Sequence, residues 1–310
     1  MFTERIVDAG EGRLHFRRET LTGLSCRISP ERSRRGIDRS ASFGFLQDGC
    51  PFCGGSLTSA TPCFADGKRI LVGESVTFPN LYPFAEWHTV TVISREHLVP
   101  TFSARQLADA FTGQWESLAG HDGYASVNWN FLPSAGASLA HPHLQGLVDS
   151  RPSPLAGRYI AGTAEYRREH GRRYGEDLRK AESDAARILT DGEIFWHASP
   201  VPLGEKEIRG VLPVSHLSGF RPLIDDFARD LVQILAFYRE LGTQAFNLSL
   251  FFDREGCDTG FSAFCSIIAR INPNVNSMSD SSFMERLHLE PVILTLPEDL
   301  AGMYREKMGR

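Results

Sequence analysis

The sequence has no long apolar stretch and no excess of positive charge. It contains no run of about 18 apolar residues, the length that a membrane-spanning helix needs. Its first residues, MFTERIVDAG, lack the apolar core of a secretory signal. The formal net charge is −5, whereas general nucleic-acid binders carry a basic excess. We therefore expect a cytoplasmic protein that binds neither membranes nor nucleic acid.

Cysteine is also scarce. Six cysteines in 310 residues are too few for a disulfide scaffold, and thiols stay reduced in the cytosol. A closely spaced pair of cysteines is therefore first interpreted as metal or redox chemistry. The hydrophobic content of 42% and the charged content of 23% are ordinary for a globular protein, and the length allows a large core. This composition is typical of a soluble enzyme.

The sequence does contain an alternation of polar side chains near its middle. In the segment Ser138-Leu139-Ala140-His141-Pro142-His143-Leu144-Gln145, two histidines and a glutamine occupy every second position. If the segment is extended, these three side chains share one face of a strand. Two imidazoles and an amide make a poor core, so they need a metal, a phosphate or each other. We interpret this segment as the chemical centre of the protein.

A second pattern is the pair Cys50 and Cys53, whose spacing lets two thiolates reach one tetrahedral Zn²⁺. Glycines follow directly and suit a knuckle turn, whereas a thioredoxin-type pair opens a helix in a βαβ unit. Two more ligands are needed, and His97 and His141 are candidates at the ends of neighbouring strands. The alternative is a pair of unrelated buried thiols. We expect one zinc site.

His143 is the candidate nucleophile. The reference pKa of histidine is about 6.5, so a neutral imidazole is available near pH 7. If a backbone carbonyl fixes the proton on Nδ1, the lone pair of Nε2 can attack a nucleotide α-phosphate and form a covalent phosphoramidate. Gln145 can steady a phosphate oxygen without delivering a proton to water. The alternative is that both histidines of the segment only hold metal.

Other residues are weaker candidates for nucleotide contacts. Asn130 and the turn that ends at Ser138 precede the reactive segment, and small residues let backbone N–H groups approach a phosphate. Arg32 and Arg35 could supply cationic forks to phosphates, although surface arginines are common. Asn80 could contact a base or ribose.

The chain also shows signs of an internal duplication. Alternating patterns predict strands at 87–94, 124–131 and 141–148, and a helix after the capping box of Ser103 and Gln106. His216 repeats His97 at an offset of 119, and strands at 246–252 and 262–271 repeat two of the first set at an offset of 122. The second offset pairs three residues of the reactive segment with apolar residues or a cysteine: His141 with Ala263, His143 with Cys265 and Gln145 with Ile267.

This pairing leaves the second copy without the reactive side chains. We therefore expect three parts: a catalytic, zinc- and nucleotide-binding half at 1–150, a charged helical connector at 151–192 and a degenerate second half at 193–310. We expect chemistry in the first half alone.

In this order, the motifs resemble those of the galactose-1-phosphate uridylyltransferase family of the histidine-triad superfamily. The matching pieces cover about the first half of the chain. They are Ser29-Pro30-Glu31-Arg32-Ser33-Arg34-Arg35, Cys50-Pro51-Phe52-Cys53-Gly54, Thr61-Pro62, Phe78-Pro79-Asn80, His97, Asn130, and Gly136-Ala137-Ser138 before His141-Pro142-His143-Leu144-Gln145.

The resemblance implies an α+β fold of two related halves, each an antiparallel sheet flanked by helices, and a homodimer. It implies a nucleotidyltransferase of galactose metabolism that moves a nucleoside monophosphate from a nucleotide-sugar to a sugar 1-phosphate through nucleotidyl-His143. It assigns zinc to Cys50, Cys53, His97 and His141, and nucleotide contacts to Arg32, Arg35, Asn80, Asn130, Ser138 and Gln145.

The second half departs from the family pattern. Family members tend to carry a histidine-rich strand where this chain reads Phe264-Cys265-Ser266-Ile267-Ile268-Ala269-Arg270, so we expect no second metal. The acceptor therefore stays open, and inorganic phosphate would make the protein an ADP-sugar or dinucleotide phosphorylase. Hydrolases of the superfamily usually carry a third histidine where this chain has Gln145, which disfavours hydrolysis. A non-catalytic, zinc-stabilised nucleotide-binding protein is the remaining alternative.

Overall fold

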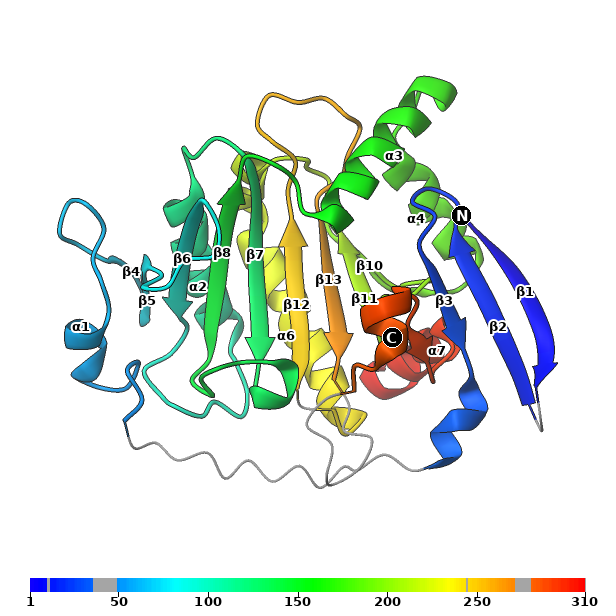
Figure 1. The fold of residues 1–310 in the computed structure, drawn as a ribbon, viewed down its shortest axis with the longest axis horizontal. Helices are drawn as coiled ribbons and strands as arrows, with labels where there is room; N and C mark the ends of the chain where they lie inside the picture. Colours follow the sequence, from blue (N-terminus) through cyan, green and yellow to red (C-terminus); the bar gives the residue numbers. More distant parts are fainter. Residues whose placement is uncertain (10–11, 36–48, 244, 271–279, 310) are drawn as a thin grey trace.

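A ten-stranded antiparallel sheet runs through the centre of the molecule (Figure 1). The computed structural model describes residues 1–9, 12–35, 49–243, 245–270 and 280–309. In spatial order, the strands are β4 (Ile70–Val72), β5 (Ser75–Pro79), β6 (Trp87–Val92), β8 (His143–Asp149), β7 (Tyr124–Phe131), β12 (Phe246–Phe251), β13 (Phe264–Ala269), β11 (Ile208–Val211), β10 (Phe195–Ala198) and β9 (Ile188–Asp191).

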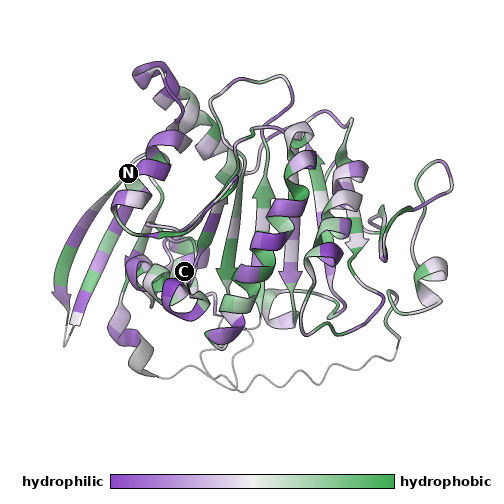
Figure 2. Ribbon diagram, turned by 180° about the vertical axis from the view of Figure 1, so that it is seen from behind, coloured by the Kyte–Doolittle hydropathy of each residue, from purple (hydrophilic) through white to green (hydrophobic). Residues whose placement is uncertain are grey.

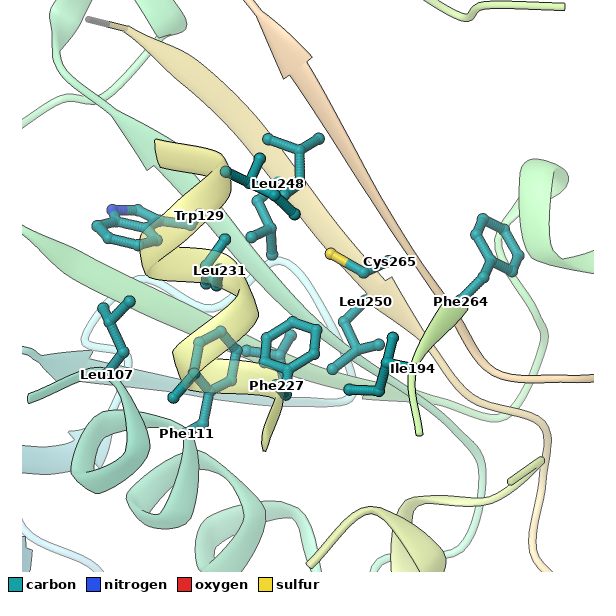
Figure 3. Close-up of a cluster of buried hydrophobic side chains, with 14 of the residues drawn as sticks. Leu107, Phe111, Trp129, Ile194, Phe227, Leu231, Leu248, Leu250, Phe264 and Cys265 are labelled. Atoms are coloured by element: carbon teal, nitrogen blue, oxygen red, sulfur yellow. The ribbon is translucent and has the colours of Figure 1, made fainter. Parts of the chain in front are cut away.

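Two long helices, α2 (Ala104–Leu118) and α6 (Ile224–Glu240), cover one face of this sheet. Their apolar stripes pack with alternate strand residues into the main core, where the rings of Phe111 and Phe227 lie 4.9 Å apart and Trp129 is fully buried (Figure 3). Seen from behind, the helices that cover the sheet carry many hydrophilic residues (Figure 2). The face of the sheet that α2 and α6 cover is the one that carries the apolar strand residues of the main core.

The predicted capping box at the start of α2 is confirmed. Ser103 accepts a hydrogen bond from the main chain of Gln106, and the Gln106 side chain accepts one from the main chain of Ser103. At the far end of α6, Gly242 has a φ of 76°, the left-handed conformation that ends many helices.

A smaller sheet packs beside the second half of the large one. It contains β1 (Phe2–Ala9), β2 (Gly12–Glu19), β3 (Ser25–Ile28) and β14 (Val292–Ile293). The other helices are α3 (Pro154–His170), α4 (Tyr174–Asp184) and α7 (Pro297–Met308), and the short turns are η1 (Pro30–Arg35), α1 (Ser56–Ala60), η2 (Pro133–Ala135), α5 (Leu217–Phe220), η3 (Arg221–Leu223) and η4 (Met284–His288).

The strand order confirms two related halves. From the centre outward, the first half runs β7, β8, β6, β5, β4 and the second runs β12, β13, β11, β10, β9, so each half adds its strands in the same pattern. The halves join where β7 pairs antiparallel with β12, with Asn130 opposite Asn247. A continuous sheet therefore carries both copies of the repeat.

The predicted offset of 122 between the inner strands is wrong by one residue. Asn128 pairs with Gln145 in the first half, and the corresponding pair is Ser249 with Ser266 in the second, which gives an offset of 121. An offset of 122 would place residues on opposite faces of the sheet, because side chains alternate. The counterparts of His143 and Gln145 are therefore Phe264 and Ser266 rather than Cys265 and Ile267.

The segment at 151–192 is more than a connector, because it forms α3 and α4 and then supplies the edge strand β9. Across the described residues, no helix combines the length and apolar character needed to cross a membrane.

Candidate metal centre and nucleotide site

The face of the sheet opposite α2 and α6, which we call the open face, carries the reactive segment of the sequence. Leu144 and Val148 of β8 point into the main core, so His143 and Gln145 point to the open face. This face of β8 and β7 is turned toward the viewer in Figure 1. The predicted alternation therefore places the apolar side chains in the core and the polar ones on the opposite face. The predicted strand begins at residue 141, whereas β8 begins at His143 and His141 lies just before it.

Four side chains predicted as ligands converge at one end of the open face. One donor atom from each of Cys50, Cys53, His97 and His141 lies within 4.8 Å of every other, and only Cys53 is partly exposed. The Cys53 Sγ lies 3.2 Å from His97 Nδ1 and 3.5 Å from His141 Nδ1. Two sulfur and two imidazole donors form the tetrahedral set that zinc prefers.

The local chain explains how these donors meet. The main-chain N–H of Cys53 donates to the Cys50 oxygen across a knuckle turn, and Gly54 follows with a φ of 51°. His141 Nε2 donates to the main-chain oxygen of Ser94 at 2.8 Å, which leaves the Nδ1 lone pair directed at the sulfurs. Burial and the neighbouring Cys50 raise the pKa of Cys53 to about 11, and a bound cation would reverse this effect.

His143 is held by the residue two positions before it. Its Nδ1 lies 2.8 Å from the main-chain oxygen of His141, so Nδ1 carries the proton and Nε2 keeps its lone pair. Burial lowers the pKa of His143, which favours the neutral ring. A neutral imidazole with a fixed tautomer and a free Nε2 can act as a nucleophile.

Phe52 links the cysteine turn to both histidines. Its ring centroid lies 5.9 Å from that of His141 and 5.5 Å from that of His143, in edge-to-face geometry. It also packs on Phe78 of β5. Phe52, one of the two residues between the cysteines, thus packs against His143.

Two predicted nucleotide residues meet through a histidine that the sequence analysis did not single out. His88 Nε2, on β6, lies 3.0 Å from both Gln145 Oε1 and Asn80 Nδ2. One nitrogen cannot donate to Gln145 and accept from Asn80 at once, so each tautomer of His88 satisfies one contact. The main-chain N–H of Phe84 lies 3.4 Å from His88 Nδ1, which favours the tautomer that donates to Gln145.

A second missed contact comes from the other half of the chain. Asn130 Oδ1 accepts a hydrogen bond of 2.7 Å from Asn247 Nδ2, and Asn247 Oδ1 accepts one of 2.7 Å from Arg270 Nη1. A signal for His88 existed in the alternation of β6, whereas no sequence signal marked Asn247, because its contact depends on how β12 pairs with β7.

The remaining predicted residues lie elsewhere or are less defined. Ser138 is exposed in the loop before β8. Arg32 is exposed on η1, which packs against β2 at the other side of the molecule from β8 (Figure 1). The side chain of Arg35 lies outside the described part of the structure. Within one chain, Arg32 is therefore not brought to His143.

Two cavities flank this region. One of about 460 Å³ is lined by Cys53, Arg95, Glu96, His97 and Leu98, so it reaches two of the four candidate ligands. The other, of about 350 Å³, has apolar walls from Phe102, Phe131, Tyr238 and Phe246. Among the described residues that line the second cavity there is no histidine, cysteine or carboxylate, so none of the four candidate metal ligands faces it.

Comparisons with known proteins support the fold. No family model matches the chain. An uncharacterized protein of Archaeoglobus fulgidus is 27% identical over 271 residues, covering 83% of this chain and 81% of its own. An ADP-glucose phosphorylase from Arabidopsis thaliana with bound ADP-glucose superimposes with a TM-score of 0.73 at 18% identity, over 94% of this chain and 98% of that one. A uridylyltransferase gives 0.71 at 16% identity, over 95% and 98%.

These likenesses extend over both halves of the chain. The chain therefore has the α+β fold of the uridylyltransferase-like proteins, two related halves joined in one antiparallel sheet. The resemblance that the motifs predicted for the first half is confirmed for the fold of the whole chain.

Proposed function

We propose that the protein is a nucleotidyltransferase that works through a covalent nucleotidyl-His143 intermediate. The observation that carries the proposal is the Nδ1 contact of His143 with the His141 oxygen, which leaves Nε2 free. In the first step, the Nε2 lone pair attacks the α-phosphorus of a nucleotide-sugar, and the bond to the departing sugar 1-phosphate breaks. In the second, an oxygen of the acceptor phosphate attacks the same phosphorus and releases His143.

Zinc is the metal that we propose for Cys50, Cys53, His97 and His141, where it would stabilise the knuckle turn. These side chains complete a closed set of four ligands, so the metal is structural. His141 then keeps a fixed backbone, and its oxygen orients the nucleophile. The groups that meet the phosphates are Gln145, Asn130 and Ser138, which donate hydrogen bonds without supplying a general base for water.

Asn80 and its neighbours are the proposed base or ribose site. The exposed rings of Tyr82 and Phe84 follow Asn80, and Phe84 lies 4.3 Å from the ring of His88. Exposed aromatic rings stack on bases whatever the base is, so this loop supports a nucleotide ligand without selecting uridine or adenosine.

The acceptor is a sugar 1-phosphate in the transferase, and inorganic phosphate in the closest second candidate, an ADP-sugar phosphorylase. The likeness to a uridylyltransferase supports the transferase. The likeness to an ADP-glucose phosphorylase supports the phosphorylase to the same degree. A homodimer, expected from the resemblance, remains part of the proposal and is tested by light scattering.

The test is a donor and acceptor screen. The purified protein is incubated with UDP-glucose or ADP-glucose, and the intact mass is measured under conditions that preserve phosphoramidates. A mass increase of one UMP or AMP group identifies the base. The trapped enzyme is then offered galactose 1-phosphate, glucose 1-phosphate or phosphate. An absence of any adduct, together with a bound and unchanged nucleotide-sugar, would favour the non-catalytic binding protein.

A further inference from the structure

The hydrogen bonds around Asn130 decide which end of its amide group is available to a ligand. Arg270, directly after β13, fixes the first orientation, because a guanidinium group can only donate. Its Nη1 lies 2.7 Å from a side-chain atom of Asn247, which must therefore be the oxygen. Asp280 accepts from Arg270 Nε at 2.7 Å and also contacts Nη2, so the arginine is held in place.

The orientation of Asn247 then fixes that of Asn130. With its oxygen on Arg270, Asn247 directs its Nδ2 toward the other side, where it lies 2.7 Å from Asn130 and 2.8 Å from the main-chain oxygen of Ala135. Both protons of Nδ2 are used, so the atom of Asn130 that meets it is Oδ1. No described residue accepts a hydrogen bond from Asn130 Nδ2.

The amide group of Gln145 has the same orientation, fixed by a different contact. Its Oε1 faces His88 Nε2 at 3.0 Å, and no described residue accepts from its amide nitrogen. On both strands of the open face, the amide oxygen is engaged by the protein and the amide nitrogen is left for a ligand. An anionic phosphate is stabilised by N–H donors and repelled by carbonyl oxygens.

We infer that Asn247 and Arg270, in the second half of the chain, are positioning residues that present the amide nitrogen of Asn130 to a phosphate oxygen of the bound nucleotide. The inference rests on the proposed function, because that function makes Asn130 a phosphate contact. It gives the second half, which lacks counterparts of His141 and His143, a part in the site of the first. The register of β7 with β12 carries this effect from one half to the other.

The decisive variant is Asn247→Asp, which keeps the shape of the side chain. A carboxylate accepts from Arg270 but cannot donate to Asn130, so the Asn130 amide turns its nitrogen to the new carboxylate and its oxygen to the ligand. We expect the dissociation constant of ADP-glucose or UDP-glucose, measured by calorimetry, to rise about tenfold, and the zinc content to stay unchanged. Affinity equal to that of the unaltered protein would overturn the inference.

Ser249→Asp is the matched control for charge. Ser249 is the next residue of β12 on the open face and pairs with Asn128 rather than Asn130. Its replacement by aspartate adds the same charge without changing the contact between Asn247 and Asn130. We expect less than a threefold change in affinity. An equal loss in both variants would assign the effect to charge and overturn the inference. If Asn247→Asp does not fold, Asn247→Ala removes the donor without adding charge, and wild-type affinity in it would overturn the inference.

A double-mutant cycle with Asn130→Ala separates positioning from a direct contact. If Asn247 acts through Asn130, Asn247→Asp causes no further loss of affinity in the Asn130→Ala background. Losses that multiply would show that Asn247 acts independently and would contradict the inference. A wild-type chain that binds the nucleotide-sugar but forms no adduct contradicts the proposed reaction alone, and the cycle still decides the inference. A chain that binds neither nucleotide-sugar contradicts both.

Discussion

The Nδ1 of His143 lies 2.8 Å from the main-chain oxygen of His141, whose own Nδ1 faces the sulfurs of Cys50 and Cys53. The proposed metal ligand and the proposed nucleophile are therefore joined by one peptide oxygen. A metal at these side chains would stiffen the backbone from which that oxygen projects, and the oxygen fixes the tautomer of His143. Loss of the metal should consequently disturb both folding and chemistry.

Replacing one cysteine ligand tests the metal centre. We expect Cys53→Ser to lose most of its zinc, measured by inductively coupled plasma mass spectrometry, and to melt roughly 10 °C lower, because metal binding to a closed site contributes directly to folding. Cys63→Ser is the control, since Cys63 is exposed and lies outside the group of four ligands. Equal zinc content in the two variants would contradict the assignment.

His88 should matter through Gln145. His88→Phe keeps a ring but removes the donor, so the Gln145 amide is free to turn, and we expect the rate of adduct formation to fall about tenfold. His88→Gln retains an N–H donor and should recover part of the rate. His121→Phe is the control, because the exposed His121 stacks on Trp87 of the same strand without reaching Gln145. Equal rates in all three variants would exclude a role for His88.

The residue at position 145 should control the fate of the intermediate. Gln145→His introduces a group that can take a proton from water, which Gln145 cannot do. We expect the release of free nucleoside monophosphate, relative to transfer onto an acceptor, to rise about tenfold. Product ratios by chromatography measure the effect. A ratio unchanged from that of the unaltered protein would mean that some other group excludes hydrolysis.

The motifs could be predicted because their chemistry is local. Cys50 and Cys53 are brought together by a turn of four residues, and the alternation of His143 and Gln145 follows from the geometry of any strand. The long helix after Ser103 was predictable from its apolar periodicity for the same reason. These features depend on spacing along the chain, which a sequence displays directly.

Contacts across strands could not be predicted in the same way. Asn247 reaches Asn130 only through the register of β12 with β7, and a one-residue error in the repeat offset is enough to exchange the faces of a strand. The same limit applies to Arg32, which is near the cysteines in sequence but lies on η1, beside the smaller sheet. Sequence proximity does not determine which side of the sheet a segment packs against.

The stability of the fold should depend on pH through Glu182, which lies on α4. Its carboxylate forms two contacts with Arg187, at 2.6 and 3.0 Å, and both side chains are buried. Burial alone would raise the pKa of Glu182, but His197 and Arg187 outweigh it and lower the pKa from 4.5 to about 2. A lowered pKa stabilises the fold above pH 4.5, and this contribution is lost as the pH falls from 4.5 toward 2.

Glu182→Gln tests this dependence. By linkage, the ionised carboxylate contributes roughly 3 kcal/mol to the free energy of unfolding near neutral pH. We expect Glu182→Gln to be less stable than the wild type at pH 6 and the gap to close toward pH 3, as measured by urea unfolding. Because both proteins carry the same metal ligands, acid release of zinc affects them alike. A gap that stays constant between pH 6 and pH 3 would contradict the prediction.

In the proposed reaction, Nε2 of His143 becomes covalently bonded to a nucleoside monophosphate. The most direct measurement is intact-mass and peptide mass spectrometry of the protein after incubation with UDP-glucose and with ADP-glucose. We expect one nucleotidyl group per chain, located on His143, labile to acid, removed by the productive acceptor and absent from His143→Ala. A nucleotidyl group on another residue, or full turnover by His143→Ala, would contradict the assignment of His143 as the nucleophile.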